Sequence, residues 1–313
     1  NKNILITGGA GSIGSELARQ ICNAGSKKVI IYDNNETELF RASQNITNKN
    51  AEYVLGDIND IEYLKKIIKK YKIQHVFHAA AYKHLNILEN NFENAIKINL
   101  FGTLNVLNSL NDNVKSFVLI STDKAVNPKS YLGISKRLAE IITQNWKKNK
   151  TSIVRFGNVF GSRGSVLEVF FSQIHKNIPL TITHKSVSRY FMSIKEACNL
   201  VLQINSLDNK NGVFILDMGR PIKILEIAKS LLKFLKMENY PIQYTKLNKG
   251  EKISETLSSS KTIFKTSHKD IFFVREKNYS NQNTMKLISF LEKNINSISI
   301  KKFNQKISNF FKN

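Results

Sequence analysis

The chain has 313 residues, of which 42% are hydrophobic and 10% aromatic, and it carries a formal net charge of +23. This suits one large globular domain or two closely packed ones, and no apolar run approaches the roughly 20 residues of a membrane span. The lysines are spread along the chain without a nucleic-acid-binding motif, so we expect no nucleic acid partner.

The first half of the chain alternates short runs rich in β-branched residues with amphipathic stretches. The expected strands are NILITGG (3–9), KKVIIYD (27–33), AEYVLGD (51–57), HVFHAAA (75–81), SFVLIST (116–122) and TSIVRFGNVFG (151–161). Helical patterns begin near Ser12, Glu36, Ile61, Asn91 and Gly133. Strand–helix alternation at this spacing predicts an α/β fold with a Rossmann-type, doubly wound parallel sheet.

After Ser162 the alternation loosens. We expect helices at 166–176, 194–206 and 224–236, and a strand at 212–219. The predicted division is a Rossmann domain at 1–160 and a smaller, intimately packed C-terminal part at 161–313, with 213–225 returning to the Rossmann sheet. The basic, amphipathic segment 298–313 is expected to form a helix that covers the body; a helix on a membrane surface is the alternative.

The segment ITGGAGSIGSELAR (6–19) places Gly8, Gly11 and Gly14 between a strand and a helix. Glycines allow a tight turn, and the helix N-terminus offers N–H groups to a pyrophosphate. Asp33 ends the next strand, where an acidic residue hydrogen-bonds a ribose hydroxyl and repels a 2′-phosphate. The pattern predicts a dinucleotide site that prefers NAD, while Asn34 and Asn35 leave NADP as the alternative. The other expected cofactor contacts are Ser12, Ile13, Asp57, Ile58, Ala79 and Ala80.

Further segments of the chain resemble one branch of the extended short-chain dehydrogenase/reductases, the nucleotide-sugar 4,6-dehydratases of bacterial surface-polysaccharide and glycan pathways. They are HAAAYKHLNILE (78–89), NLFGTLNVL (99–107), STDKAVNP (121–128), VRFGNVFGSRGSV (154–166), SRYFMSIKEA (188–197) and GEKISE (250–255). The resemblance implies NAD(P)-dependent 4,6-dehydration of a UDP-N-acetylhexosamine, UDP-N-acetylglucosamine in the first place. It also implies that 161–313 binds the nucleotide sugar, and that helices near 91–110 and 133–147 build a homodimer or higher oligomer.

Short members of this family carry a tyrosine four residues before the helix lysine, whereas long membrane-tethered members commonly carry methionine there. In this chain that position, relative to Lys136, is Leu132. The transmembrane part of the long forms is absent from the sequence, so we expect a catalytic fragment or a soluble relative. Tyr131 is a rival proton carrier, but one residue along a helix rotates a side chain by about 100°, so we expect it to point elsewhere.

Asp123 and Lys124 follow a predicted strand, at the sheet edge where this fold places its ligands. By resemblance, Asp123 is the acid at the C6 hydroxyl and Lys124 the base at C5 of the sugar. We expect Thr122 to position the C4 hydroxyl, and Lys136 or a bound water to carry its proton away. Lys136 should also reach the nicotinamide ribose, and Asn99 should support it.

The nucleotide sugar is expected to lie among nine residues: Lys83, His84, Asn158, Arg163, Gly164, Ser165, Arg189, Tyr190 and Glu251. Arginine and exposed backbone N–H groups suit its diphosphate. The family usually has arginine and proline before GEK, whereas this chain has Asn248 and Lys249, so one phosphate contact is expected to be lost or moved to Lys249.

Two other functions stay open. A UDP-sugar epimerase of the same fold would leave Asp123 and Lys124 idle, and a catalytically silent protein would bind nucleotide without converting a sugar. Cys22 and Cys198 lie in helical patterns without metal or CxxC spacing, and no signal peptide is visible. We therefore expect no metal and a cytoplasmic location, with contact to the inner face of the membrane as the alternative.

Overall fold

The computed structural model describes residues 2–207, 211–259 and 262–312. Its centre is a nine-stranded sheet in the order β14-β15-β11-β6-β5-β4-β1-β2-β3. Seven neighbouring strands run parallel: β1 (Asn3–Thr7), β2 (Lys28–Asp33), β3 (Ala51–Leu55), β4 (His75–His78), β5 (Ser116–Ile120), β6 (Lys150–Arg155) and β11 (Gly212–Leu216). Antiparallel β15 (Ile271–Val274) and β14 (Ile263–Lys265) complete it. The predicted Rossmann-type sheet is confirmed.

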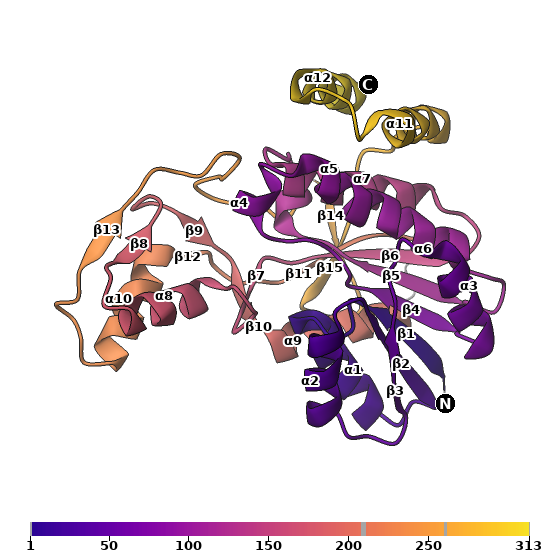
Figure 1. The fold of residues 1–313 in the computed structure, drawn as a ribbon, viewed down its shortest axis with the longest axis horizontal. Coiled ribbons are helices and arrows are strands. Elements are labelled where there is room, and N and C mark those ends of the chain that lie inside the picture. Colours follow the sequence, from indigo (N-terminus) through magenta and orange to yellow (C-terminus); the bar gives the residue numbers. More distant parts are fainter. Residues whose placement is uncertain (1, 208–210, 260–261, 313) are drawn as a thin grey trace.

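Both faces of the sheet are covered, which explains why its strands are apolar almost throughout. Leu5 of β1 belongs to one hydrophobic core, whereas Ile4 and Ile6 belong to the other. Figure 1 shows α1 (Ser12–Asn23), α2 (Glu36–Asn45) and α9 (Ile194–Gln203) on one side of the sheet. The other side carries α3 (Ile61–Lys70), α5 (Phe92–Ala95), the π-helix Ile96–Gly102, α6 (Thr103–Ser109) and α7 (Tyr131–Asn145).

A smaller lobe extends from the body, on the left of Figure 1. It contains α8 (Val166–His175), α10 (Ile224–Phe234), the paired strands β8 (Leu180–Ile182) and β13 (Ile242–Tyr244), and the paired strands β9 (Ser188–Arg189) and β12 (Ile222–Lys223). Where the lobe meets the body, β7 (Asn158–Phe160) pairs with β10 (Phe191–Ser193). The short helix α4 (Leu85–Leu88) follows β4.

The expected boundary at residue 160 is not a boundary in space. After residue 160 the chain returns to the main sheet. The strands β11, β15 and β14 extend that sheet at one edge, and α9 packs on one of its faces and buries apolar side chains there. Within 213–225, β11 lies beside β6, whereas β12 pairs with β9 in the lobe.

The last two helices, α11 (Asn281–Asn294) and α12 (Ile300–Lys312), also pack on the body. Phe303, Ile307 and Phe310 of α12 are buried, and the Phe303 ring lies 4.8 Å from that of Phe92. The basic tail is therefore a cover over the α5–α7 side of the sheet. None of the helices within the described ranges is long and apolar enough to cross a membrane.

Candidate functional site

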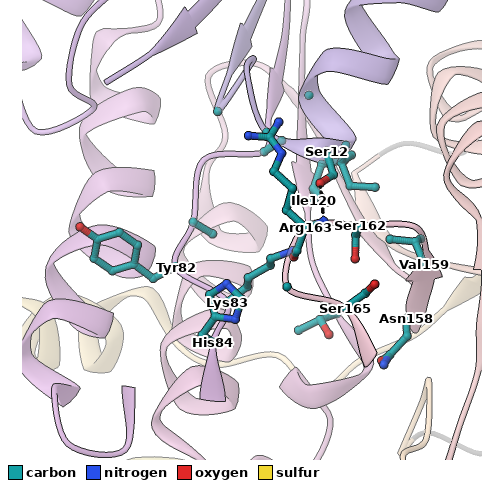
Figure 2. A pocket seen from close by; sticks show the side chains of 18 of the residues that line it. Ser12, Tyr82, Lys83, His84, Ile120, Asn158, Val159, Ser162, Arg163 and Ser165 are labelled. Carbon is teal, nitrogen blue, oxygen red and sulfur yellow. Dashed lines mark hydrogen bonds between the residues drawn. The ribbon is translucent and has the colours of Figure 1, made fainter. Parts of the chain in front are cut away.

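A cavity of about 640 Å³ opens at the carboxyl ends of the parallel strands and is lined by both the body and the lobe (Figure 2). Sixteen predicted site residues line it: Gly8, Gly11, Ser12, Ile13, Gly14, Asp33, Ala79, Lys83, His84, Thr122, Lys124, Lys136, Asn158, Arg163, Gly164 and Ser165. The glycine loop and Asp33 form one end of this cavity, and Lys83, His84, Lys124 and Asn158 line the other.

The glycine loop has the geometry that a dinucleotide needs. Gly8 has a φ of +64°, and a Cβ on it would lie 2.5 Å from the backbone nitrogen of Ala80. A Cβ on Gly14 would collide with the carbonyl oxygen of Gly8. Within the described part of the chain no side chain caps the N-terminus of α1, which leaves its N–H groups to a pyrophosphate. The loop therefore fits the predicted cofactor.

The acidic residues near this loop are placed differently from one another. Asp33 lines the cavity, and its Oδ2 accepts a hydrogen bond from the Ala10 N–H at 3.0 Å. Ile58 and Ala80 line an adjoining cavity of about 160 Å³. Asp57 lines neither cavity, and its carboxylate accepts hydrogen bonds from Asn59 and Asn34 instead. The Asp57 side chain is thus directed to these two neighbours, and its contact with the cofactor stays a prediction.

Lys136 lies on α7, and its side chain is buried beneath the cavity. Its Nζ donates to the carbonyl oxygen of Ile120 at 2.6 Å. Burial lowers the pKa of Lys136 to about 8, and the negative charge of Glu140 opposes this shift. A minor fraction of this amine, much larger than for an ordinary lysine, is therefore neutral near physiological pH, and that fraction can accept a proton.

Asn99 supports the site through the backbone rather than through Lys136. Its Oδ1 accepts from the Tyr82 N–H at 2.8 Å, and its Nδ2 donates to the Tyr82 carbonyl oxygen at 3.1 Å and to Ser135 Oγ at 3.0 Å. Asn99 thus ties the segment after β4 to α7. Its place in a π-helix is typical of functional positions.

Thr122, Asp123 and Lys124 form one hydrogen-bonded group. Asp123 Oδ1 accepts from Thr122 Oγ1 and from Lys124 Nζ, each at 2.9 Å. Lys124 Nζ also donates to Asn158 Oδ1 at 3.3 Å. Thr122 and Lys124 line the cavity, whereas Asp123 is fully buried behind them. Among the described atoms, Asp123 Oδ2 is buried without a hydrogen-bond partner.

Leu132 and Tyr131 face different ways at the start of α7. Leu132 lines the cavity and packs with Leu88 and Ala95. The Tyr131 ring is buried with its centroid 5.3 Å from that of Phe92, outside the cavity. The predicted rotation away from the site is therefore observed.

The segment 161–165 lies across the cavity. The Lys83 Nζ donates to the carbonyl oxygen of Arg163 at 2.7 Å. The backbone N–H of Arg163 donates to Ser12 Oγ at 3.1 Å, and its guanidinium contacts Glu38 and the carbonyl oxygen of Ala10. Arg163 was expected to contact the sugar diphosphate, but its guanidinium lies beside the glycine loop.

Three predicted substrate residues lie outside this cavity. Arg189 is buried and pairs with Glu251, Nη2 to Oε1, at 3.1 Å. Thr183 Oγ1 donates to the same carboxylate oxygen at 3.0 Å. Tyr190 packs behind Gly157, where an added Cβ would lie 2.7 Å from the Tyr190 Cβ. Arg189 and Glu251 thus pair with one another outside the lining of this cavity, and the phosphate, ribose and base contacts expected of Arg189, Tyr190 and Glu251 stay predictions.

Several lining residues were not predicted. They are Glu38, Ala81, Tyr82, Ile120, Ser121, Phe156, Gly157, Val159, Ser162, Val166 and Phe191, while Asn34, Asn35 and Leu132, named above for the NADP alternative and for the tyrosine position, line the cavity as well. Most of them adjoin a predicted residue in sequence, so their place at strand ends was the available signal. For Glu38 the sequence offered another indication of a place near the cavity, since it lies in the first turn of α2, the helix that follows Asp33.

No metal site accompanies the cavity: across 2–207, 211–259 and 262–312, no group of three or more His, Cys, Asp and Glu side chains could hold a metal ion.

The sequence matches known proteins over most of its length. The model of a family described as polysaccharide biosynthesis protein matches residues 4–276. The capsular polysaccharide biosynthesis protein CapD of Staphylococcus aureus is 41% identical over 275 residues, which cover 84% of this chain and 46% of CapD. The chain thus spans about half the length of that relative.

Two further relatives carry different enzyme names. The UDP-N-acetylglucosamine 4,6-dehydratase (inverting) of Campylobacter jejuni is 33% identical, with 83% of this chain and 78% of that protein covered. The UDP-glucose 4-epimerase of Rickettsia rickettsii is 30% identical, with 85% and 80% covered. Among solved structures, Pen from Bacillus thuringiensis is 31% identical with a TM-score of 0.82, covering 88% of this chain and 89% of Pen.

Proposed function

The chain belongs to the polysaccharide biosynthesis protein family of extended short-chain dehydrogenase/reductases, and on that basis we propose that it is a nucleotide-sugar 4,6-dehydratase. The proposed substrate is a UDP-N-acetylhexosamine, and UDP-N-acetylglucosamine is the first candidate. The relative of that name from Campylobacter jejuni supports this choice. The product would be a 4-keto-6-deoxy sugar nucleotide.

The observation that carries this proposal is the group formed by Thr122, Asp123 and Lys124. Dehydration across C5 and C6 requires a base for the C5 proton and an acid for the C6 hydroxyl. Lys124 lines the cavity, and its Nζ lies 2.9 Å from Asp123 Oδ1. An amine and a carboxyl held this close at the sugar end can divide the two proton transfers between them: one group removes the C5 proton and the other protonates the C6 hydroxyl.

In the proposed mechanism, Lys124 accepts the C5 proton at Nζ. The proton for the C6 hydroxyl comes from the carboxyl of Asp123 by way of Thr122. For this transfer the hydrogen bond between Thr122 Oγ1 and Asp123 Oδ1 reverses, so that Oδ1–H donates to Oγ1 and Thr122 passes its own proton into the cavity. Thr122 also positions the C4 hydroxyl, and Lys136 takes the proton that this hydroxyl loses.

A nicotinamide dinucleotide, when bound, would take the hydride from C4 and return it to C6. The residues proposed to hold it are the glycine loop, Ser12, Ile13, Asp33 and Ala79. Asp33 favours NAD over NADP, because its carboxylate would repel a 2′-phosphate. Solved neighbours of this fold are described in complex with NAD, among them the UDP-glucose 4-epimerase of Thermus thermophilus.

The second candidate is 4-epimerisation of a UDP-sugar. It is favoured by the relative named UDP-glucose 4-epimerase, which matches about as much of this chain as the dehydratase does. Epimerisation moves a proton only at the C4 hydroxyl and leaves Lys124 and Asp123 without a task. We therefore rank it second, ahead of a silent nucleotide-binding protein.

We also propose a cytoplasmic homodimer. The two helical stretches expected at its contact are 91–110 and 133–147. The helix α12 of the same chain packs against both of these helical regions, on Phe92 and on Tyr131 at the start of α7, so neither stretch is preferred over the other. Light scattering coupled to size-exclusion chromatography tests for the dimer.

The deciding experiment mixes the purified protein with UDP-N-acetylglucosamine, with and without NAD, and follows the sugar by mass spectrometry and proton NMR. A product lighter by one water with a new C6 methyl doublet supports dehydration. An isomer of unchanged mass supports epimerisation. If the protein binds the dinucleotide but leaves UDP-N-acetylglucosamine unchanged, the result counts against both dehydration and epimerisation of this sugar.

A further inference from the structure

The direction of the Arg163 side chain separates it from the residues expected to bind the sugar. Figure 2 shows it extending away from Asn158 and Ser165, while its backbone lies beside Ser12. The guanidinium contacts the carbonyl oxygen of Ala10 in the glycine loop and the carboxylate of Glu38 on α2. Every one of these contacts lies at the dinucleotide end of the cavity.

The backbone on both sides of Arg163 fixes this direction. Gly161 and Gly164 have φ values of +72° and +67°, in the left-handed region that favours glycine. A Cβ on Gly164 would lie 2.5 Å from the His84 ring. Lys83 holds the carbonyl oxygen of Arg163 from the sugar side at 2.7 Å. The segment is thus anchored at the sugar end while its guanidinium reaches the other end.

Electrostatics identifies what this guanidinium is suited to bind. It lies near the N-terminus of α1, which is the positive end of a helix, so a cation there needs negative partners. In the free protein the Glu38 carboxylate supplies that charge. A dinucleotide pyrophosphate at the same helix N-terminus would supply two negative charges in the reach of a planar, forked donor.

We propose that Arg163 binds the pyrophosphate of the dinucleotide and closes the segment 161–165 over it. This deepens the proposed function and rests on it, since a cofactor whose hydride returns within each turnover gains from being retained. The same segment would join the two sites, because its backbone faces the sugar end and its side chain faces the cofactor.

The test compares ligand affinities of the full chain and of Arg163→Gln by calorimetry, with ADP-ribose as the dinucleotide probe and UDP as the sugar-nucleotide probe. ADP-ribose should bind about 10- to 100-fold more weakly to the variant, the usual range for one charge-assisted contact. UDP should stay within about two-fold. NADH should leave the variant correspondingly faster in a stopped-flow chase. Arg163→Lys keeps the charge but loses the fork, so it should fall between the two.

Arg41→Gln is the matched control. Arg41 also pairs with Glu38, at 2.7 Å, but does not line the cavity, so this variant should bind both probes as the wild type does. The Arg163 side chain is 45% exposed, and an unchanged melting temperature would show that Arg163→Gln remains folded.

Three results would overturn the proposal: a loss of UDP binding alone, an equal loss for both probes, or no loss for either. A failure of this inference about Arg163 can be told apart from a failure of the proposed reaction. A wild type that dehydrates no UDP-N-acetylglucosamine, with the ADP-ribose loss confined to Arg163→Gln, refutes the reaction and keeps the assignment. A wild type that does not bind ADP-ribose refutes the proposed cofactor and this inference together.

Discussion

The ring of Tyr131 packs edge-on against the ring of Phe303, with centroids 5.8 Å apart at an angle of 63°. This contact joins the first residue of α7 to α12 in the hydrophobic core. The next residue, Leu132, lines the cavity instead. The tyrosine that lies nearest to the family position in sequence is therefore a core residue in space.

Tyr131→Phe should turn over UDP-N-acetylglucosamine at a rate within about two-fold of the wild type, because the ring remains packed and the hydroxyl does not reach the cavity. Tyr131→Ala should lower the free energy of unfolding by about 3–5 kcal/mol, the usual cost of deleting a buried ring. Steady-state kinetics and urea unfolding measure the two effects. A hundredfold fall in kcat for Tyr131→Phe at unchanged stability would return this residue to the mechanism.

The pH dependence of turnover should report Lys136. Burial lowers the pKa of Lys136 to about 8, so the neutral amine that accepts a proton becomes more abundant as the pH rises through that value. We expect kcat to rise from pH 6, to reach half of its plateau near pH 8 and to level off above about pH 9. Lys136→Met should lose most of the activity and this rising limb; a variant with an unchanged profile would assign the limb to another group.

Stability should respond to the same group with a definite sign. The lysine pKa is lowered by folding from its ordinary value of about 10.4 to about 8, so between these values the unfolded chain binds the additional proton. The free energy of unfolding should therefore gain a contribution that rises with pH between about 8 and 10.4. Urea titrations of the wild type and Lys136→Met across this window should differ in slope, whereas parallel curves would contradict the burial argument.

Features set by neighbouring residues in the chain were predictable from the sequence. The strand–helix alternation predicted the parallel sheet, and the spacing of Gly8, Gly11 and Gly14 predicted the tight turn between β1 and α1, because both depend on local periodicity and turn geometry. The rotation of Tyr131 away from the site followed from helix geometry alone.

Contacts between distant segments were not predictable in the same way. Arg163 contacts Glu38 across the cavity, and Arg189 pairs with Glu251 in the lobe. A sequence motif shows that an arginine is present. The direction of its guanidinium depends on the backbone conformation of the loop and on the position of the nearest carboxylate, which the motif does not contain. The return of β15 and β14 to the main sheet likewise depends on pairing that leaves no local pattern.

The glycine loop gives a third prediction. A Cβ on Gly14 would collide with the backbone of Gly8, so Gly14→Ala should weaken ADP-ribose binding by more than about tenfold and cost about 1–3 kcal/mol of stability through overpacking. Gly25→Ala is the control, since Gly25 has a φ of +77° and open space around its Cα. It should lower stability through backbone strain and leave ADP-ribose affinity unchanged. Equal affinities for all three proteins would argue against this loop as the phosphate site.

A buried ion-pair network under the site gives a fourth prediction. Arg155 and Arg137 both bind Glu140, at 2.6 and 2.9 Å, and Glu276 completes the network. Although burial alone would raise it, the charges of Arg155 and Arg137 lower the pKa of Glu140 to about 2. Glu140→Gln should cost about 3–5 kcal/mol at pH 7, because it leaves buried arginine charge uncompensated.

The acid limb of stability checks the same network. A lowered carboxyl pKa contributes stability that is fully present above the ordinary value of about 4.5 and is lost as the pH falls towards about 2. Wild-type stability should fall over this window more steeply than that of Glu140→Gln. Glu62→Gln, which breaks the exposed pair with Lys65, should leave the curve unchanged. A Glu140→Gln curve parallel to the wild type would contradict the assigned charge state.

The proton chemistry at C5 separates the roles of Lys124 and Asp123. If Lys124 removes the C5 proton, the wild type working in D2O should place one solvent deuterium at C5 of the product, visible as one additional mass unit and a changed C6 methyl signal. Lys124→Met should remove neither water nor the C5 hydrogen, since the proposed base for C5 is gone while Lys136 serves the C4 hydroxyl. Asp123→Asn keeps a hydrogen-bond acceptor for Lys124 but loses the acid, so it should exchange C5 hydrogen for deuterium in unreacted sugar faster than it forms product.

Exchange that persists in Lys124→Met at wild-type rate would assign the base to another residue. Dehydrated product that forms without any deuterium would show that the abstracted proton returns to C5 before it exchanges with solvent, which would contradict a base that lines the open cavity, as Lys124 does.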